Sequence, residues 1–497
     1  MNTSNLKNKT GKLNSKNHRS DKLRLAIALC LSSVLVMSVS ACNDETVNEI
    51  TDALAENAEA LSISNTTDAE ALLISNPADL AQQQTAHKHH GHLGYRQPGY
   101  VNQDAYISEN IFGVDNLAYY GDWDSNRVYI IDVDNMTLIT SVEGTGDGPY
   151  GIDQQGANKA YALTRRTESL TVVDNYMLEN KGLIELQHKP RSTNFNANTL
   201  LSLVSGGDKA MTSIIRTDMD KVTKVVGENV LTTPHDFGGS LSTGHPLWIS
   251  DHHFFMLDRA SRQIQLWNRQ GTMLSVLQTP TSVHHIFQPP ASTMAAGEQN
   301  VFYAVIEGNQ DEQVSPGIIR FSINKNSLQQ TAQVNLHDYD PVNLDINTMG
   351  AHHADFHPDG EFIYIGSAEG HTFVIDKNTM GIEAMIDTGA GAGHTTFLPM
   401  RNQAIITNHN ATYMTVIDTL NHQFVRNVGV ATSASPDYKS QAHTSGVSLD
   451  MEYFYSTASH DGVFFRIDLD TWQVDKTYIG GNLLMGSFIW NGEGVNM

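Results

Sequence analysis

The chain is 497 residues long and has 54 acidic against 31 basic side chains, which gives a formal net charge of −23. An acidic protein repels phosphate backbones, so this charge argues against nucleic acid as a partner. Both cysteines, Cys30 and Cys42, precede residue 43, so the rest of the chain can form no disulfide, no thiolate metal site and no C-x-x-C-H attachment site for haem.

The first 41 residues have the features of a secretory signal peptide. A basic stretch ending at Arg24 precedes the apolar run LAIALCLSSVLVMS, which is shorter than the ~20 residues of a membrane-spanning helix. The next four residues, VSAC, resemble the lipobox of bacterial lipoproteins. This resemblance implies cleavage before Cys42 and a diacylglycerol on its thiol; the alternative is an ordinary signal peptide that ends near a cysteine. Because Asn43 follows the cysteine, we expect a lipoprotein on the periplasmic face of the outer membrane, with the inner membrane or the cell surface as alternatives.

Residues 42–86 are predicted to form a flexible acidic tether, because they are rich in Ala, Asn, Ser, Thr, Asp and Glu and have almost no aromatic side chains. The segment that follows, residues 87–96, has four histidines within six positions: His87, His89, His90 and His92. Tracts this dense in histidine are typical of metal binding, and neutral imidazoles bind divalent ions near neutral pH. The sequence therefore predicts a metal-binding arm here, the alternative being a solvated polar run.

From about residue 110 the pattern changes to short strands joined as hairpins. Apolar runs such as RVYIIDV and SLTVVD are separated by turn signals such as DSN and HPDGE, and no helical period of useful length follows residue 100. Residues 148–174 are a template of three strands whose last ends in Val-Asp. Copies of it begin at residues 242, 282, 350, 392 and 442, mostly 40–50 residues apart. That spacing is typical of the four-stranded blades of a β-propeller.

The sequence therefore predicts an all-β fold, a single β-propeller of seven or eight four-stranded blades over residues 110–497. Residues 116–133 lack an inner strand and residues 483–497 supply one, so we expect the two segments to share a blade that closes the ring. Residues 175–241 match the template poorly and are expected to form a degenerate blade. The repeats resemble the YVTN-type β-propellers, a family that includes the cytochrome d1 domain. The resemblance implies the fold but little about function.

Histidine recurs at one place in the repeats, in the pattern His-x-x-Phe or His-x-x-Trp at the start of the inner strand. Equivalent positions of successive blades converge on the axis of a propeller, so we expect these side chains to surround one mouth of the channel. Imidazoles without an acidic partner in each repeat suit Zn²⁺, Cu or Ni, and we expect zinc in preference to copper. The candidate ligands are His245, His284, His285, His352, His353, His394 and His443, with His235 and Asp355 close to them in sequence.

The alternative for these residues is a hydrogen-bonding histidine that the repeats have duplicated. Tyr150 occupies the same place in the template, however, so duplication alone does not require histidine. The remaining histidines of the repeats are expected in outer turns or strands, with no part in a site: His252, His253, His371, His409, His422 and His460.

The sequence favours binding over catalysis, because it has no G-x-S-x-G, H-E-x-x-H, P-loop or dinucleotide motif. A His-rich arm ahead of a propeller resembles the propeller-type periplasmic zinc metallochaperones, which implies a metal transporter or a metal-receiving protein as partner. SVHHIF and GAHHADF look similar to the His-His pair of nitrous-oxide reductase, which implies a redox enzyme with a His-ligated copper centre. This chain lacks the cysteine-containing copper domain of that family. A third alternative is a scaffold that binds protein partners.

Overall fold

The computed structural model describes residues 117–155, 159–231, 243–432, 445–448, 450–481, 484–489 and 495–496. All of them belong to the second of the two units into which the chain divides, Ala78–Met497. The signal peptide, Cys42 and the acidic tether lie outside the described residues, so their assignments stay predictions. Within the described ranges, no helix is long and apolar enough to cross a membrane.

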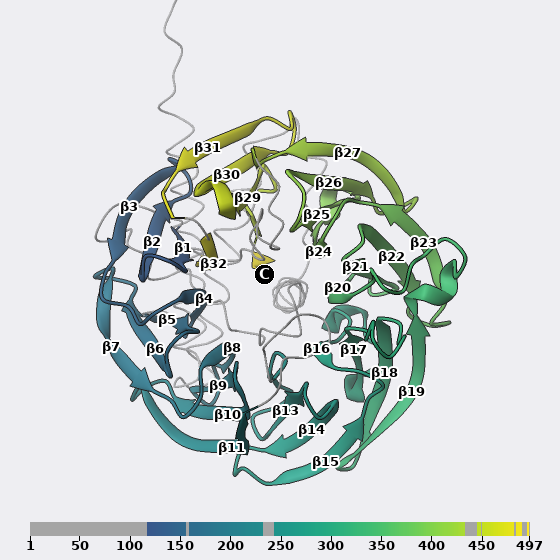
Figure 1. Ribbon diagram of the computed structural model, residues 1–497, viewed down its shortest axis with the longest axis horizontal. Helices are drawn as coiled ribbons and strands as arrows, with labels where there is room; N and C mark the ends of the chain where they lie inside the picture. Colours follow the sequence, from purple (N-terminus) through teal and green to yellow (C-terminus); the bar gives the residue numbers. More distant parts are fainter. Residues whose placement is uncertain are drawn as a thin grey trace, which may run out of the picture. The chain divides into compact units, whose positions relative to one another are not determined.

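The described residues form eight antiparallel sheets arranged in a ring, which is the fold of a β-propeller (Figure 1). Each sheet is one blade, whose strands follow one another from the channel to the rim. The prediction of an all-β propeller is confirmed, and the structure has eight blades where the sequence allowed seven or eight. Short 3-10 segments lie between some strands: η2 (Ala291–Thr293), η3 (Glu298–Asn300), η4 (Leu336–Tyr339), η5 (Pro399–Arg401) and η6 (Ser459–Asp461).

The first four blades are numbered here in chain order, each from its inner strand outward. Blade 1 consists of β32 (Leu484–Ile489), β1 (Leu117–Asp122), β2 (Arg127–Asp132) and β3 (Thr137–Val142). Blade 2 consists of β4 (Pro149–Gln154), β5 (Lys159–Thr164), β6 (Ser169–Asp174) and β7 (Glu179–Glu185). Blade 3 consists of β8 (Pro190–Asn196), β9 (Leu201–Gly206), β10 (Lys209–Arg216) and β11 (Lys221–Leu231). Blade 4 consists of β12 (Leu247–Trp248), β13 (His253–Asp258), β14 (Gln263–Asn268) and β15 (Met273–Gln278).

The other four blades follow the same order. Blade 5 consists of β16 (Val283–Phe287), β17 (Val301–Ile306), β18 (Gly317–Asn324) and β19 (Ser327–Asn335). Blade 6 consists of β20 (Ala351–Phe356), β21 (Phe362–Ser367), β22 (His371–Asp376) and β23 (Ile382–Asp387). Blade 7 consists of β24 (Ala392–Leu398), β25 (Gln403–Asn408), β26 (Tyr413–Asp418) and β27 (Gln423–Gly429). Blade 8 consists of β28 (Gly446–Val447), β29 (Tyr453–Ala458), β30 (Val463–Asp468) and β31 (Val474–Tyr478), and β33 (Val495–Asn496) pairs with β28.

Two sequence expectations concern these blades. Blade 1 is completed by a strand from the other end of the chain, as predicted, with Leu117 of β1 opposite Ile489 of β32. A blade is also present within residues 175–241, as blade 3, whose four strands pair with register shifts in β8 and β10. Its third strand, β10, ends in Arg216 where the template has Val/Ile-Asp, but pairing in a sheet depends on burial and alternation.

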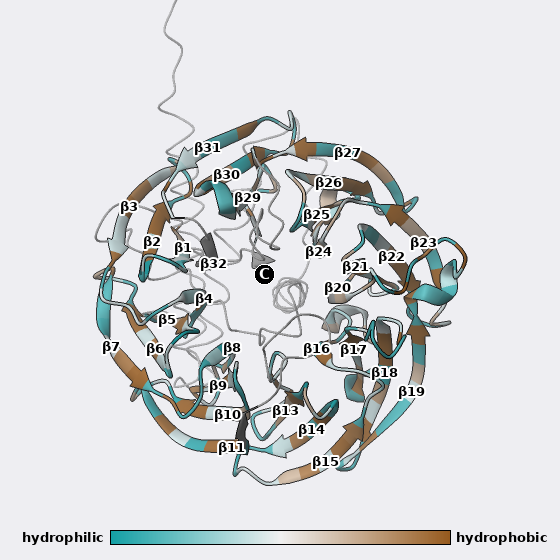
Figure 2. Ribbon diagram, viewed as in Figure 1, coloured by the Kyte–Doolittle hydropathy of each residue, from teal (hydrophilic) through white to brown (hydrophobic). Residues whose placement is uncertain are grey.

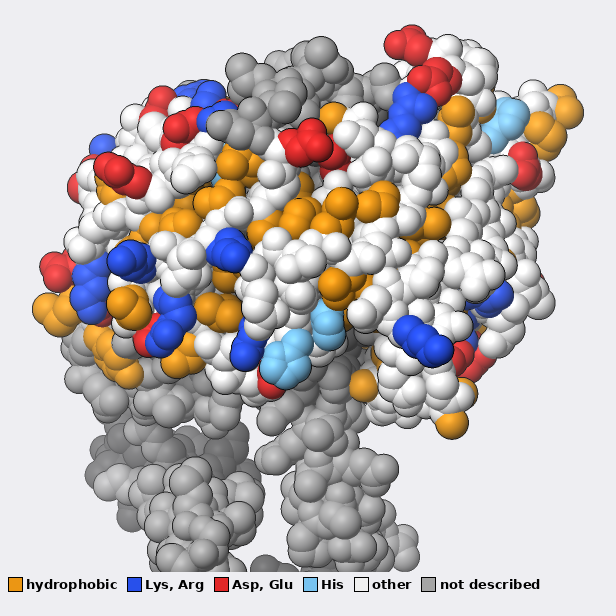
Figure 3. Space-filling model, turned by 90° about the horizontal axis from the view of Figure 1, so that it is seen from below, with side chains coloured by type: hydrophobic (Ala, Val, Ile, Leu, Met, Phe, Trp, Pro, Cys, Tyr) orange, Lys and Arg blue, Asp and Glu red, His pale blue; other side chains and the backbone are white. Residues whose placement is uncertain are grey.

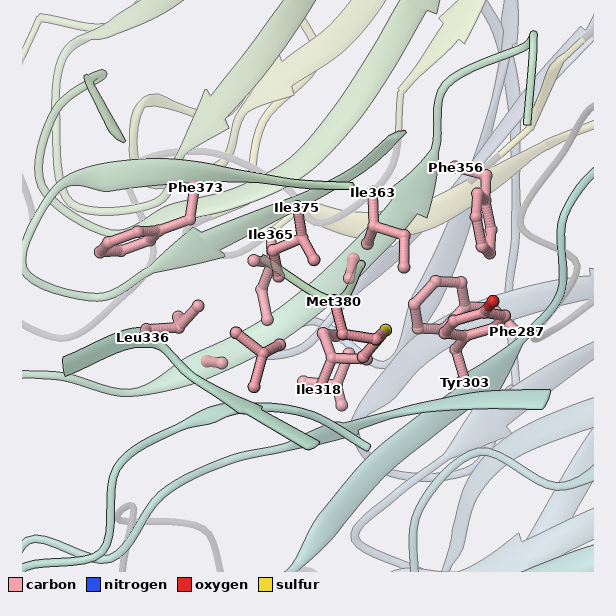
Figure 4. Close-up of a cluster of buried hydrophobic side chains, with 14 of the residues drawn as sticks. Phe287, Tyr303, Ile318, Leu336, Phe356, Ile363, Ile365, Phe373, Ile375 and Met380 are labelled. Carbon is pink, nitrogen blue, oxygen red and sulfur yellow. The ribbon is translucent and has the colours of Figure 1, made fainter. Parts of the chain in front are cut away.

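The hydrophobic core lies between neighbouring blades, where the faces of their sheets meet. Figure 4 shows the cluster between blades 5 and 6, in which the rings of Phe287, Tyr303 and Phe356 pack at tilted or edge-to-face angles beside Ile318 and Ile363. Burial of each such side chain contributes roughly 1.5–3 kcal/mol. The middle strands of the blades are largely apolar, whereas rim strands such as β7 and β19 contain many polar residues (Figure 2). The rim near β11 and β15 carries charged side chains of both signs among hydrophobic ones (Figure 3).

The aspartates at the ends of third strands form the turns that lead to the rim strands, as the sequence predicted. Asp376 accepts hydrogen bonds from the backbone N–H groups of Asn378 (2.8 Å) and Thr379 (2.7 Å). These hydrogen bonds, that of Thr379 above all, lower the pKa of Asp376, against the effect of its partial burial. Two residues after Asn378 the backbone turns left-handed, with φ of 55° at Met380. The same bonding to the following turn occurs at Asp132, Asp174, Asp418 and Asp468.

Candidate metal centre at the channel

Six of the inner strands carry one extra residue near the channel mouth. On β16 the chain advances three residues, from Val283 to Ile286, while its partner β17 advances only two, from Ile306 to Ala304. The same three-against-two step occurs on β4, β8, β20 and β24, and before β12 four residues oppose three. A β-bulge takes its residues out of the regular ladder and changes the direction of their side chains. Each blade with a bulge can therefore present two side chains to the channel.

The bulges define two positions, and they correct the alignment made from the sequence. The pattern His-x-x-Phe placed His284 in register with His245, His353 and His394. By the strand register, His285 is their equivalent, and His284 lies one position earlier, level with His352. Because a bulge adds a residue without changing the apolar pattern, the sequence could not reveal this shift. Level with His284 lie Tyr150 in blade 2 and Arg191 in blade 3.

Three histidines from consecutive blades meet at this mouth: His245 of blade 4, His284 of blade 5 and His353 of blade 6. One ring nitrogen of each lies within 4.8 Å of the others. The ring centroid of His284 lies 5.1 Å from that of His245 and 4.7 Å from that of His353. Tetrahedral zinc with bonds of ~2.0–2.1 Å places its ligand nitrogens roughly 3.3 Å apart, so the three nitrogens would have to approach one another by up to about 1.5 Å to share one ion. The predicted convergence of these three residues is therefore present in the structure.

Further imidazoles lie next to this triad. The ring of His394, from blade 7, lies 3.5 Å from that of His353 between centroids. The ring of His285 lies 5.0 Å from that of His353, and its Nε2 is 3.1 Å from the carbonyl oxygen of Ala354. His409, which the sequence assigned to an outer turn, is buried and its ring lies 6.1 Å from that of His394. The turn after β25 returns to the channel mouth, so His409 belongs to this neighbourhood.

Buried charged partners surround the ring of His284. Its Nδ1 is 2.8 Å from Oε1 of Glu307, and a carboxylate can only accept, so Nδ1 carries a proton. Nη2 of Arg191 lies beside the same ring, 3.2 Å from Nε2 and 3.5 Å from Nδ1. Because Nδ1 is bonded to Glu307, Nε2 is the nitrogen of His284 that could bind a metal ion. A carboxylate on the far nitrogen is the usual support of a metal-ligating histidine.

Glu307 is itself held rigidly by blade 4 and by its own blade. Nη2 of Arg259 donates to both of its oxygens, at 2.7 and 2.9 Å, and Ser282 donates to Oε2 at 2.6 Å. Arg259 is 4% exposed and Glu307 is fully buried. The sequence predicted imidazoles without an acidic partner and did not reveal Arg259 and Glu307, because these two residues follow β13 and β17 and meet only across the blade interface.

Arg191 is a third residue near the triad that the sequence did not reveal. Arg191 is 2% exposed. It follows Pro190 at the start of β8, as Tyr150 follows Pro149 at the start of β4 in the template. Aligning these two strands on their prolines would have placed Arg191 at the channel. Arg165 of blade 2 donates to the carbonyl oxygen of Arg191, with its Nη2 at 2.8 Å. The guanidinium of Arg165 also lies over the ring of Tyr150, at 3.3 Å, and burial lowers the pKa of Arg165.

Comparison with known proteins supports the fold. No family model and no curated protein matches the chain. Among solved structures, the dihydro-haem d1 dehydrogenase NirN in complex with DHE is similar over 77% of this chain and 77% of its own, with 13% identity and a TM-score of 0.55. Apo AztD from Citrobacter koseri is similar over 77% of this chain and 98% of its own, with 11% identity and a TM-score of 0.49. The periplasmic gluconolactonase PpgL of Pseudomonas aeruginosa is similar over 64% of this chain and 98% of its own, with 13% identity and a TM-score of 0.46. At such identities the likeness to NirN shows the propeller fold alone, and the YVTN assignment stays a prediction.

Several predicted ligands lie outside what the structure describes. They are His443 and His235 of the propeller and the four histidines of the arm, His87, His89, His90 and His92. His352 lies on β20, where only its backbone is described. Asp355 is buried on the same strand, two residues after His353.

Proposed function

We propose that the protein binds a transition-metal ion, zinc in preference to copper, at the channel mouth through His245, His284 and His353. The observation that carries this proposal is the convergence of three imidazole nitrogens within 4.8 Å of one another. Nothing in the packing of a blade requires three polar rings there, since the core lies between the sheets. Imidazole sets without thiolates suit Zn²⁺ and Cu²⁺, and three histidines with an open fourth position are a common zinc site.

The surroundings of the triad support a prepared site. Two of its rings are buried, with exposures of 1% for His284 and 3% for His353, while His245 is partly exposed and offers an approach from the channel. The hydrogen bond to Glu307 holds Nε2 of His284 ready as a ligand. A site on inner strands has already lost its conformational freedom, so it can impose its geometry on an ion and hold it tightly.

The role we propose for this site is storage and delivery of the metal ion by a periplasmic lipoprotein. In this proposal the arm at residues 87–92 captures ions, the channel site holds them, and Cys42 anchors the protein to the membrane near a metal transporter or another receiving protein. The support is the composition of the arm and of the signal peptide. A flexible arm must lose chain entropy when it wraps an ion, so its affinity is expected to be lower than that of the channel site.

The test is a zinc titration of untagged protein, residues 43–497, against a chromophoric chelator. We expect two classes of site. Deleting residues 83–94 should remove only the weaker class, and His245→Ala with His353→Ala should remove only the tighter one. The matched control is His252→Ala with His253→Ala, a pair on the other side of the same blade, which should leave both classes intact. Tight binding that survives the loss of His245 and His353 would refute the channel site.

Copper redox chemistry is the second candidate, and the number of imidazoles favours it. His285 and His394 adjoin the triad, so the mouth offers more nitrogens than one zinc ion uses. Protein purified from cells grown with both metals distinguishes the two functions. Bound copper with visible absorption and a paramagnetic resonance signal supports the redox candidate, whereas colourless protein with one bound zinc supports storage and delivery.

A further inference from the structure

We propose that the face of the propeller opposite the histidines rests on a lipid surface, so that the channel mouth opens away from the membrane. Because the blades are antiparallel, the turns from inner to second strands and from third to rim strands all lie at this end. We call it the far face. The inference rests on the lipid anchor at Cys42 in the proposed function and is independent of the metal site.

Blade 7 carries apolar side chains at the tips of both its far-face turns. Met400, in η5 between β24 and β25, is 81% exposed, and Leu420, between β26 and β27, is 67% exposed. The two turns adjoin, because the N–H of Thr419 donates to the carbonyl oxygen of Asn402 at 2.9 Å. Phe424, near the start of the rim strand β27, is also exposed. Large apolar side chains that gather in water mark an interaction surface.

Blade 3 repeats this arrangement on the opposite side of the ring (Figure 1). Leu200 lies in the turn between β8 and β9, Met219 lies in the turn between β10 and β11, and both are exposed. These turns adjoin as well, because the N–H of Thr217 donates to the carbonyl oxygen of Leu200 at 3.0 Å. In the neighbouring blade 2, the turn between β6 and β7 adds exposed Met177.

Apolar tips on opposite sides of one ring fit a plane better than a compact partner. A protein partner would have to span the whole face to cover both groups, whereas a lipid surface accepts apolar side chains at many separate points. On the histidine side, the exposed large apolar residues that the structure describes outside strands are Tyr339 and Val342. Both belong to the single connection between β19 and β20, so that side has no such distribution.

The chain also enters the propeller at the far face. Leu117, the first residue of β1, lies opposite Ile489, the last residue of the inner strand β32, and inner strands end at this face. Residues 43–116 therefore connect Cys42 to the far face. A lipid on Cys42 would keep the propeller near the membrane. Contact of the far face with lipid is then intramolecular, so weak affinity at each apolar tip suffices.

This orientation makes the metal site accessible from water. His245 is the partly exposed member of the triad and offers the approach from the channel mouth. With the far face on lipid, a soluble receiving protein reaches this mouth directly, whereas a transporter embedded in the same membrane lies on the other side of the ring. The orientation therefore favours a soluble protein as the receiver of the ion.

The experiment places an environment-sensitive dye on single introduced cysteines of the mature protein, which is then mixed with phosphatidylcholine vesicles. Met400→Cys and Met219→Cys report on opposite sides of the far face. The matched control is Val342→Cys, which is 87% exposed on the histidine side. We expect the emission of both far-face dyes to shift to shorter wavelength on vesicles and to be quenched by nitroxide-labelled lipid, while the control stays unchanged. Because the contact is apolar, high salt should not reverse the shift.

A second variant tests whether the two sides act together. Met400→Asp with Leu420→Asp, made in the Met219→Cys protein, should reduce the shift of the dye on blade 3, whereas Val342→Asp in the same protein should not. These positions are exposed, so the substitutions leave the core intact.

The outcomes separate the inference from the proposed function. Absence of a shift in both far-face variants, in protein that sediments with the vesicles, overturns the inference and leaves the anchor standing. A shift in Met400→Cys alone overturns the flat orientation and indicates a contact confined to blade 7, and equal shifts at all three positions overturn it too. Cys42 is the only native cysteine after residue 41, so dye on the unsubstituted protein shows a free thiol. That result, or failure to sediment with vesicles, overturns the anchor and the inference together, while the zinc titration tests the metal site separately.

Discussion

His284 is hydrogen-bonded to a buried carboxylate, and this bond determines which of its nitrogens a metal ion can use. Glu307 can only accept, so it holds the proton of His284 on Nδ1 and leaves Nε2 as the possible ligand. Glu307 is a positioning residue: it acts on the metal through His284 and does not contact the ion.

Replacing Glu307 with Gln should weaken both the site and the fold. We expect zinc affinity to fall about 10–100-fold, the usual effect of removing a support of a ligating histidine. Arg259 would lose a buried ionic partner, so the free energy of unfolding should fall by about 3 kcal/mol. Zinc competition and chemical denaturation measure the two effects. The control is Glu312→Gln at the exposed pair with Arg262, which should cost no more than about 1 kcal/mol and leave zinc binding unchanged. Unchanged zinc affinity in a folded Glu307→Gln protein would contradict the positioning role.

At the scale of elements, the sequence predicted the strands well and their exact pairing poorly. Alternating apolar residues and Val/Ile-Asp endings located most strands, because these patterns follow from burial on both faces and from the turn that the aspartate forms. The bulges on the inner strands could not be recognised from the apolar pattern. His284 was therefore aligned with His353 and His394, although the strand register shows that His285 is their equivalent. Residues that meet across blades, such as Arg259 and Glu307, could not be paired from the sequence. The repeat pattern shows which residues are equivalent in different blades, but it does not show which side chains touch between neighbouring sheets.

The turns between third and fourth strands store backbone strain that can be released. Lys325 joins β18 to β19 with φ of 54°, a conformation that costs an L-residue roughly 1–2 kcal/mol, and its side chain is exposed. Lys325→Gly should therefore raise the free energy of unfolding by about 0.5–1 kcal/mol, after the greater flexibility of glycine in the unfolded chain is subtracted. Chemical denaturation measures the change. Lys476→Gly on the rim strand β31 is the control and should lower stability by a similar amount. Loss of stability in Lys325→Gly would show that the turn is not strained.

At the scale of the whole molecule, the ring depends on one strand that comes from far along the chain. β32 pairs with β1 over its full length, so blade 1 has no inner strand without it. The sequence predicted this closure because an inner strand was missing at one end of the repeats and left over at the other. The number of blades could not be predicted, because the residues that form blade 3 match the repeat template poorly.

Removing β32 should open the ring, and supplying it from the other side should close it again. A chain that ends at residue 481 exposes one edge of β1, and each large apolar side chain that loses its cover costs roughly 1.5–3 kcal/mol. We expect its melting temperature by calorimetry to fall sharply. Ile489 lies opposite Leu117, so a permuted chain can join residues 484–489 to residue 117 through a hairpin loop of about four residues. This permutant should regain the melting temperature of an unpermuted chain that spans residues 117–489. Equal stability of the truncated and permuted chains would contradict closure by β32.

In the proposed function, three histidines from three blades hold one metal ion at the channel mouth. The most direct measurement is anomalous diffraction at the zinc absorption edge from crystals of untagged protein, residues 43–497, grown with one equivalent of zinc. We expect one strong peak about 2.0–2.1 Å from a nitrogen of each of His245, His284 and His353. Zinc found only elsewhere, with these three rings still bonded as they are without metal, would contradict it.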